Sequence, residues 1–177
     1  MNNVFFIADL HAGHRGLMNI LRSYNQAHLR GNAKDLREME AWLIAQWNSR
    51  VTKRDQTYVL GDACFNASGV EMIKKLNGNK ILLRGNHDLV SYEKLKTAFG
   101  SIIGFRKKWG MWLSHAPIHP ESLRGLINVH GHLHASKVLD ASGEPDKRYV
   151  GVSVEQLGGV PISLDEIKEM NREWIKS

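Results

Sequence analysis

Metal-binding side chains directly follow five short apolar runs of the sequence. The runs cover residues 4–8, 57–60, 80–83, 111–114 and 126–130, and their length and content of β-branched residues predict buried β-strands. Asp, Asn or His stands within a few residues of the end of each run. This repeated arrangement constrains the chain to a fold in which separate strands end close to one common site.

Helical patterns between these runs predict an α/β fold. Residues 35–50 repeat apolar positions at helical spacing, and Asp35 with Glu38 is typical of a capping box at the start of this helix. Ser163 with Glu166 predicts a second capping box, which opens a C-terminal helix to about residue 174. Further helices are expected at 17–23, 70–76 and 91–98, and further strands at 101–107 and 149–154.

The strand-end residues are candidate ligands for divalent metal ions. Ligands of open α/β sheets bind outside the carboxyl ends of the strands, where residues far apart in the sequence meet. Alternate residues of an extended segment point the same way, so Asp9 and His11 can hold one ion together. The candidates combine carboxylate, amide and imidazole groups: Asp9, His11, Asp62, Asn86, His115, His132 and His134. Such ligands suit Mn, Fe, Co, Ni or Zn, and the lone Cys64 excludes a thiolate-based site.

Structural interpretations compete with these functional ones. Taken singly, each strand-end residue is explained by the preference of turns and caps for Asp and Asn, but the ordered set of seven favours metal ligands. His14 and Arg15 either contact a substrate phosphate or belong to a solvated basic loop. The basic run 106–108 before Trp109 is either an edge strand protected by its charges, which we favour, or a nucleic-acid-binding patch.

Composition excludes several broad classes of protein. The net charge of +6 favours anionic partners or substrates. No apolar run approaches the roughly 18 residues that cross a bilayer, and the N-terminal segment lacks the basic start of a signal peptide. We therefore expect a cytoplasmic protein without membrane partners. The 177 residues contain no repeat or linker, so one domain over residues 1–177 is expected.

The order of the strand-end blocks resembles the calcineurin-like metallophosphoesterases. The blocks are Asp9 with His11, Gly61 with Asp62, the Gly-Asn-His-Asp segment 85–88, His115, and the Gly-His-Leu-His segment 131–134. They occur in the order of the superfamily and span about residues 4–134, and the chain is most similar to its small, cap-less phosphoesterases of bacteria and phages. The resemblance implies a four-layer α/β/β/α sandwich of two mixed sheets flanked by helices.

The resemblance also implies two divalent metal ions, with manganese favoured over Fe, Zn, Co or Ni. One ion would be held by Asp9, His11, Asp62 and His134, and the other by Asp62, Asn86, His115 and His132. Asp62 would bridge the two ions and would therefore be essential for catalysis. Two ions about 3.5–4 Å apart stabilise the attacking and leaving oxygens and lower the pKa of bound water towards about 7. We expect hydrolysis by a metal-bridging hydroxide, without a phosphoenzyme.

His87 is the second catalytic residue that the resemblance implies. Beside Asn86, it would face the leaving group as a general acid or stabilise the charge of the transition state, and both residues would bind substrate. The phosphatase branches of the family orient this histidine with an aspartate three residues after the bridging one. Phe65 stands at that position here. Either Asp88 or another group orients His87, or its ring is less strongly polarised.

These residues together predict a metal-dependent phosphoesterase. We favour a phosphodiesterase acting on a phosphorylated small molecule or nucleotide over a phosphomonoesterase. A nuclease acting on DNA or RNA is the alternative within the same superfamily. A non-catalytic interaction scaffold is disfavoured, because every ligand position is filled. Monomer and homodimer both remain open.

Overall fold

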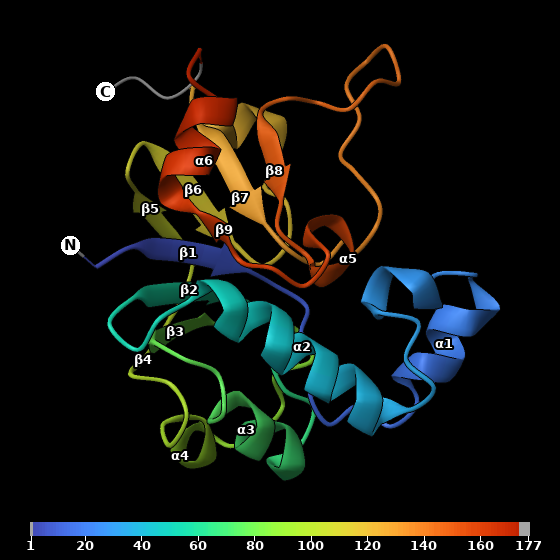
Figure 1. The fold of residues 1–177 in the computed structure, drawn as a ribbon. Coiled ribbons are helices and arrows are strands. Elements are labelled where there is room, and N and C mark those ends of the chain that lie inside the picture. Colours follow the sequence, from blue (N-terminus) through green and yellow to red (C-terminus); the bar gives the residue numbers. More distant parts are fainter. Residues whose placement is uncertain (1, 174–177) are drawn as a thin grey trace.

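The computed structural model describes residues 2–173 and contains a five-stranded sheet (Figure 1). The sheet contains β1 (Val4–Ile7), β2 (Gln56–Leu60), β3 (Asn79–Leu83), β4 (Ser101–Ile103) and β9 (Ile162–Ser163). The strand order is β4-β3-β2-β1-β9, in which β1 to β4 are parallel and β9 is antiparallel to β1. The inner strands are buried on both faces, as their continuous apolar runs predict.

A second sheet of four strands packs against the first. It contains β5 (Arg106–Lys108), β6 (Met111–Ser114), β7 (Ile127–His130) and β8 (Tyr149–Gly151), in that order. Strands β6, β7 and β8 are parallel, whereas β5 is antiparallel to β6. Both sheets are therefore mixed, and the predicted α/β sandwich of two mixed sheets is confirmed.

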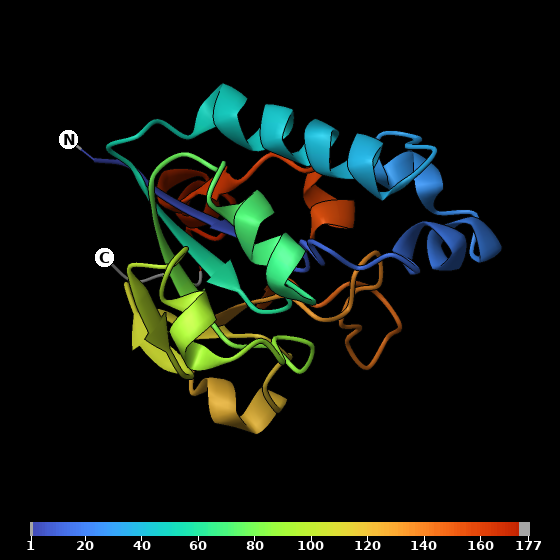
Figure 2. The same ribbon diagram turned by 90° about the horizontal axis from the view of Figure 1, so that it is seen from below.

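Two hydrophobic layers hold the sandwich together. Between the sheets, Phe6 and Leu60 of the first pack with Leu113 and Val129 of the second. The opposite face of the first sheet is covered by α2 (Leu36–Arg50), α3 (Ala67–Ile73) and α4 (Tyr92–Leu95) (Figure 1). Figure 2 shows α2 and the short 3₁₀ helix η2 (Pro120–Leu123) on opposite sides of the two sheets.

Four further helices complete the described chain. They are α1 (Leu17–Ser23), the 3₁₀ helix η1 (Ala27–Arg30), α5 (Val154–Leu157) and α6 (Leu164–Met170). The capping box of Ser163 and Glu166 is present at the start of α6. That helix ends at Met170, and residue 174, where the prediction ended it, lies outside the described residues. Within residues 2–173, no helix is both long and apolar enough to cross a membrane.

Several predicted boundaries are wrong, each for a local reason. The predicted strand 101–107 is two strands, because β4 pairs with β3 whereas β5 pairs with β6 of the other sheet. The predicted strand 149–154 ends at Gly151, since Ser153 already precedes the first turn of α5. Helix α3 begins at Ala67 rather than residue 70, because the Asn66 side chain caps it by accepting from the Gly69 N–H. Helix α4 ends at Leu95, three residues before the predicted end.

We expect Leu43→Ala to lower the free energy of unfolding by about 2–5 kcal/mol, because it leaves a cavity where α2 packs on the first sheet. Chemical denaturation measures this change. The matched control is Ile20→Ala in α1, whose side chain is 46% exposed, with an expected change within about 0.5 kcal/mol. Equal effects of the two substitutions would contradict this packing.

Candidate metal centre

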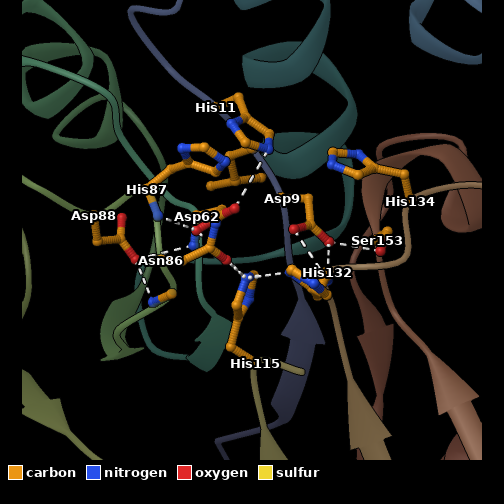
Figure 3. Close-up of polar contacts among 12 residues, drawn as sticks. Asp9, His11, Asp62, Asn86, His87, Asp88, His115, His132, His134 and Ser153 are labelled. Carbon is orange, nitrogen blue, oxygen red and sulfur yellow. Dashed lines mark hydrogen bonds and ion pairs between the residues drawn. The ribbon is translucent and has the colours of Figure 1, made fainter. Parts of the chain in front are cut away.

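The carboxyl ends of strands from both sheets meet at one rim, which Figure 3 shows in close-up. The segment after β1 is joined to the segment after β2, because the backbone N–H groups of Asp9 and His11 donate to Gly61 and Asp62 at 3.0 and 2.9 Å. The segment after β7 is joined to the end of β6, since the Gly131 N–H donates to the His115 carbonyl at 2.9 Å. All seven candidate metal ligands therefore lie within one small region.

The backbone of this rim is strained at the candidate ligands. Asp9, His11, Asp62, His132 and His134 all have positive φ angles, of 60°, 50°, 52°, 71° and 51°. Residues other than glycine rarely adopt this left-handed conformation, and such strain concentrates at functional sites. The positive φ angles of Asp9 and His11 also show that these residues do not form the extended segment that the predicted alternation assumes.

Two glycines allow the ligands to approach closely. A Cβ atom on Gly61 would lie 2.2 Å from Nδ1 of His115, and one on Gly85 would lie 2.2 Å from Oδ1 of Asp62. Gly61 also has a φ of +87°, which disfavours any other residue. Both positions precede a candidate ligand in the sequence, and the structure explains why a side chain does not fit there.

The first group of candidate ligands contains Asp9, His11 and His134, whose ligand atoms lie within 4.8 Å of one another. Oδ2 of Asp62 lies 3.7 Å from Nε2 of His11 and adds a fourth candidate ligand atom. Both ring nitrogens of His11 are buried without a hydrogen-bond partner among the described residues. Burial, together with the nearby Arg30, lowers the pKa of His11 to about 3, so its ring is neutral at pH 7. A neutral, unpartnered imidazole fits a metal ligand.

The second group surrounds Nε2 of His115. This atom lies 2.9 Å from Oδ1 of Asn86, 3.3 Å from Nδ1 of His132 and 3.4 Å from Oδ1 of Asp62. Nδ1 of His115 is 2.9 Å from the Leu60 carbonyl oxygen, a contact that places the proton on Nδ1 and leaves Nε2 free for a ligand. Asp62 therefore directs one oxygen at each group.

The two acidic side chains of the rim are buried. Asp9 is fully buried, and burial raises its pKa to about 6, although the Ser153 hydroxyl and the His132 N–H both donate to its carboxylate. Burial also opposes ionisation of Asp62, but its interaction with the His115 ring and the hydrogen bond from the His87 N–H lower its pKa to about 2. Two buried carboxylates surrounded by imidazole rings match the nitrogen and oxygen ligands of a divalent metal ion.

A buried ion pair that the sequence analysis missed supports the first group. Nδ1 of His134 lies 3.1 Å from Oε1 of Glu155, and the same oxygen is 2.7 Å from the Arg30 guanidinium. The Arg30 and Glu155 side chains are fully buried, and Arg30 also donates to the carbonyls of Asp9 and Leu10. Carboxylates that orient metal-binding histidines in this way are common around metal sites.

A sequence signal existed for one member of this pair. Glu155 follows the apolar run 149–154 just as the candidate ligands follow their runs. A search for polar residues at the end of that run would have identified Glu155, which follows it, and Ser153, which lies near its end. Arg30 lies in η1, far from any strand end, and no pattern marked it.

Comparison with known proteins decides the family. The sequence model described as calcineurin-like phosphoesterase matches residues 3–177. The chain belongs to the calcineurin-like phosphoesterase family. It is accordingly a metal-dependent phosphoesterase, and the family implies divalent metal ions at the rim that carries the two ligand groups.

Relatives of this calcineurin-like phosphoesterase come from archaea, phages and bacteria. An uncharacterised protein of Methanocaldococcus jannaschii is 30% identical over 96% of this chain and 92% of its own length. The gene 66 protein of Mycobacterium phage L5 is 29% identical over 96% of this chain and 94% of its own length. The crystal structure of a protein of unknown function from Aquifex aeolicus shares the fold, with a TM-score of 0.68 and 23% identity, and covers 96% of this chain and all of its own.

Phe65, which replaces the aspartate of the phosphatase branches, is stacked between two histidines. Its ring centroid lies 4.3 Å from that of His14, with an angle of 10° between the planes, and 5.9 Å from that of His87. Asp88 is not available to orient His87, because its carboxylate accepts the backbone N–H groups of Asp62, Ala63, Cys64 and Gly85. The His87 ring is therefore held by ring contacts with Phe65 and His11.

The other candidate residues lie at different depths. Asn86 and His87 are exposed on the rim, and His14 is half-buried beside Phe65. Arg15 is exposed, and among the described residues no hydrogen bond or ion pair joins it to the ligand groups.

We expect Glu155→Gln to weaken Mn²⁺ binding about 10- to 100-fold, because His134 loses the carboxylate that orients its ring. Isothermal titration measures this change. The substitution also leaves the buried Arg30 without its anion, which lowers the free energy of unfolding by about 3–5 kcal/mol. Denaturation in the presence of a chelator measures that loss separately from metal binding.

The control for this substitution is Glu71→Gln, which removes an exposed ion pair with Lys74. It should change neither metal affinity nor stability measurably. Unchanged Mn²⁺ affinity in Glu155→Gln would show that Glu155 does not orient a ligand.

Proposed function

We propose that this chain is a binuclear phosphodiesterase that hydrolyses a nucleotide-like substrate directly. The observation that carries the proposal is the position of Asp62. One of its oxygens lies 3.7 Å from His11 of the first group, and the other lies 3.4 Å from His115 of the second. A carboxylate shared in this way fits a bridge between two divalent ions.

The proposed ligand sets follow from these groups. Asp9, His11, Asp62 and His134 would hold one ion, and Asp62, Asn86, His115 and His132 the other, with Mn²⁺ as the first ion to test. When bound, the two ions would supply an activated water as nucleophile and positive charge for the oxygens of the phosphoryl group. The shared Asp62 carboxylate would fix their separation.

The absence of a suitable side-chain nucleophile supports direct hydrolysis. Cys64 is buried, and burial raises the pKa of its thiol to about 12, so it carries no thiolate at neutral pH. Around the ligand groups of the described chain, the Ser153 hydroxyl donates to Asp9 at 2.6 Å, and the Ser114 hydroxyl donates to the Ala116 carbonyl at 2.7 Å. Neither serine is directed at a substrate position, so we propose a reaction without a phosphoenzyme.

His87 would act on the leaving group. Its backbone N–H donates to Asp62 at 2.8 Å, which fixes its position relative to the ligand groups, while its side chain is exposed at the rim. An imidazole here is free to give a proton to the departing oxygen. Stacking with Phe65 would restrict the ring's orientation without polarising it. We therefore propose that stacking, rather than a carboxylate, positions His87 at the leaving group.

The net charge of +6 supports an anionic substrate, and the exposure of Asn86 and His87 on the rim leaves room for a phosphate with two ester substituents.

In the presence of Mn²⁺, we expect faster turnover of an aryl phosphodiester than of the matching monoester. Asp62→Asn should lower kcat by more than about 100-fold, because it removes the charge that the two ions share. Substitution of residues that only contact the ligands typically lowers activity 10–100-fold. A monoester preference would overturn the assignment as a diesterase, and full activity of Asp62→Asn would overturn the bridging role.

We expect His87→Ala to lower kcat roughly 10²- to 10⁴-fold on a diester with an alkoxide leaving group. A p-nitrophenolate leaving group departs without a proton, so on a p-nitrophenyl diester the same substitution should lower kcat much less. Metal content should stay unchanged, because His87 is not a proposed ligand. His28→Ala, which alters an exposed histidine of η1, is the control. Equal losses with both leaving groups would exclude proton donation by His87.

A further inference from the structure

An exposed aromatic stack lies on the outer face of the second sheet. Lys107 of β5 pairs with Trp112 of β6, and both side chains lie on the face opposite the core residues Met111 and Leu113. The Phe105 ring stacks on Trp112 at a centroid distance of 4.9 Å with an angle of 13° between the planes. Phe105 is nevertheless 57% exposed, so one face of its ring is open to solvent.

A groove separates this stack from the segment around η2. The groove has a volume of about 760 Å³, and we call it the Phe105 groove; its lining includes Phe105, Lys107, Trp112, His119, Glu121 and Arg124. Lys107 and Arg124 are exposed cations on its walls, and Glu121 is its one acidic lining residue. Arg106, also exposed, pairs with Leu113 and so lies on the other face of β5, outside the groove. An open ring face bordered by cations suits a chain of bases and phosphates.

The Phe105 groove begins close to the candidate metal centre. Arg106 pairs with Leu113, which lies two residues before His115, so Phe105 is at the end of β5 that faces the rim. On the opposite wall, Ile118 and His119 follow His115 by three and four residues. The groove is therefore lined by residues next to the end of β6 that carries His115.

We propose that the Phe105 groove binds single-stranded nucleic acid next to the hydrolysed phosphodiester. One base would stack on the open face of Phe105, and Lys107 and Arg124 would contact the flanking phosphates. The proposal rests on the proposed diesterase function and names its substrate class. The sequence analysis favoured an edge strand whose charges only prevent aggregation. We now favour the nucleic-acid-binding patch, because protection of an edge strand explains the charges but not the exposed aromatic stack.

Charge also disfavours a second copy of the chain as the occupant. Strand β5 forms an edge of its sheet, and its residues 106–108 are all cationic. Pairing of this edge with its copy would bring two runs of three cations together. A polyanion instead neutralises them.

The test measures binding of a fluorescein-labelled oligo-dT of twelve residues to the Mn²⁺-loaded protein by fluorescence anisotropy. Phosphorothioate linkages protect the probe from hydrolysis. Phe105→Ala should weaken binding roughly 5- to 150-fold, because one stacked base is lost. Lys107→Ala should reduce the slope of log affinity against log salt by about 0.7, as expected for one lost phosphate contact to a single strand.

The controls are Tyr92→Ala and Lys96→Ala. Tyr92 is 51% exposed on α4, and Nζ of Lys96 lies 5.4 Å from its ring centroid, so the pair matches the chemistry of the groove elsewhere on the surface. The proposal is overturned if the groove variants and the control variants lose oligonucleotide affinity equally, or if the wild-type protein does not bind the oligonucleotide. It is also overturned if Phe105→Ala changes the oligomeric state but leaves oligonucleotide binding unchanged.

Turnover of a small aryl phosphodiester separates this proposal from the proposed function. It should be the same in the wild-type protein and in all four variants, because none of the substituted residues belongs to the ligand groups. Normal turnover with unaffected oligonucleotide binding rejects the groove alone. Failure of the wild-type protein to hydrolyse the small diester rejects the diesterase function itself.

Discussion

Two buried carboxylates that lie close together determine how the rest of this molecule is built. Oxygen atoms of Asp9 and Asp62 lie within 4.8 Å of each other, and both side chains are almost completely buried. At an effective dielectric constant of about 20, two negative charges at that distance repel by about 3 kcal/mol. Burial already raises the pKa of Asp9 to about 6. Positive charge beside this pair, such as divalent ions supply, stabilises both carboxylates as anions.

The surrounding chain is organised to hold these acids at the junction of the two sheets. Strands β1 and β2 deliver the carboxylates, β6 and β7 deliver imidazoles from the second sheet, and close backbone contacts at Gly61 and Gly85 leave no room for other side chains. The ion pair of Arg30 and Glu155 then ties His134 to the backbone after β1. Positive φ angles at five candidate ligands indicate that packing elsewhere in the fold holds this strained arrangement.

Much of this arrangement could be predicted from the sequence, because it depends on local patterns. Seven predicted runs cover every strand of the described chain except β9, with one run spanning both β4 and β5, and the strand-end polar residues include every member of the two ligand groups. Contacts across the chain were not predictable in the same way. The division of residues 101–107 between two sheets depends on which strand each half pairs with, and Arg30 is buried because of a partner 125 residues away. The stacking of Phe65 with His14 and His87 likewise exists only in three dimensions.

The central claim is that Asp62 is shared by two metal ions, and anomalous diffraction from crystals grown with Mn²⁺ tests it most directly. The account predicts two anomalous peaks about 3.5–4 Å apart, with Asp62 between them, one beside His11 and the other beside His115. A single peak, or two peaks that lie away from Asp62, would contradict it.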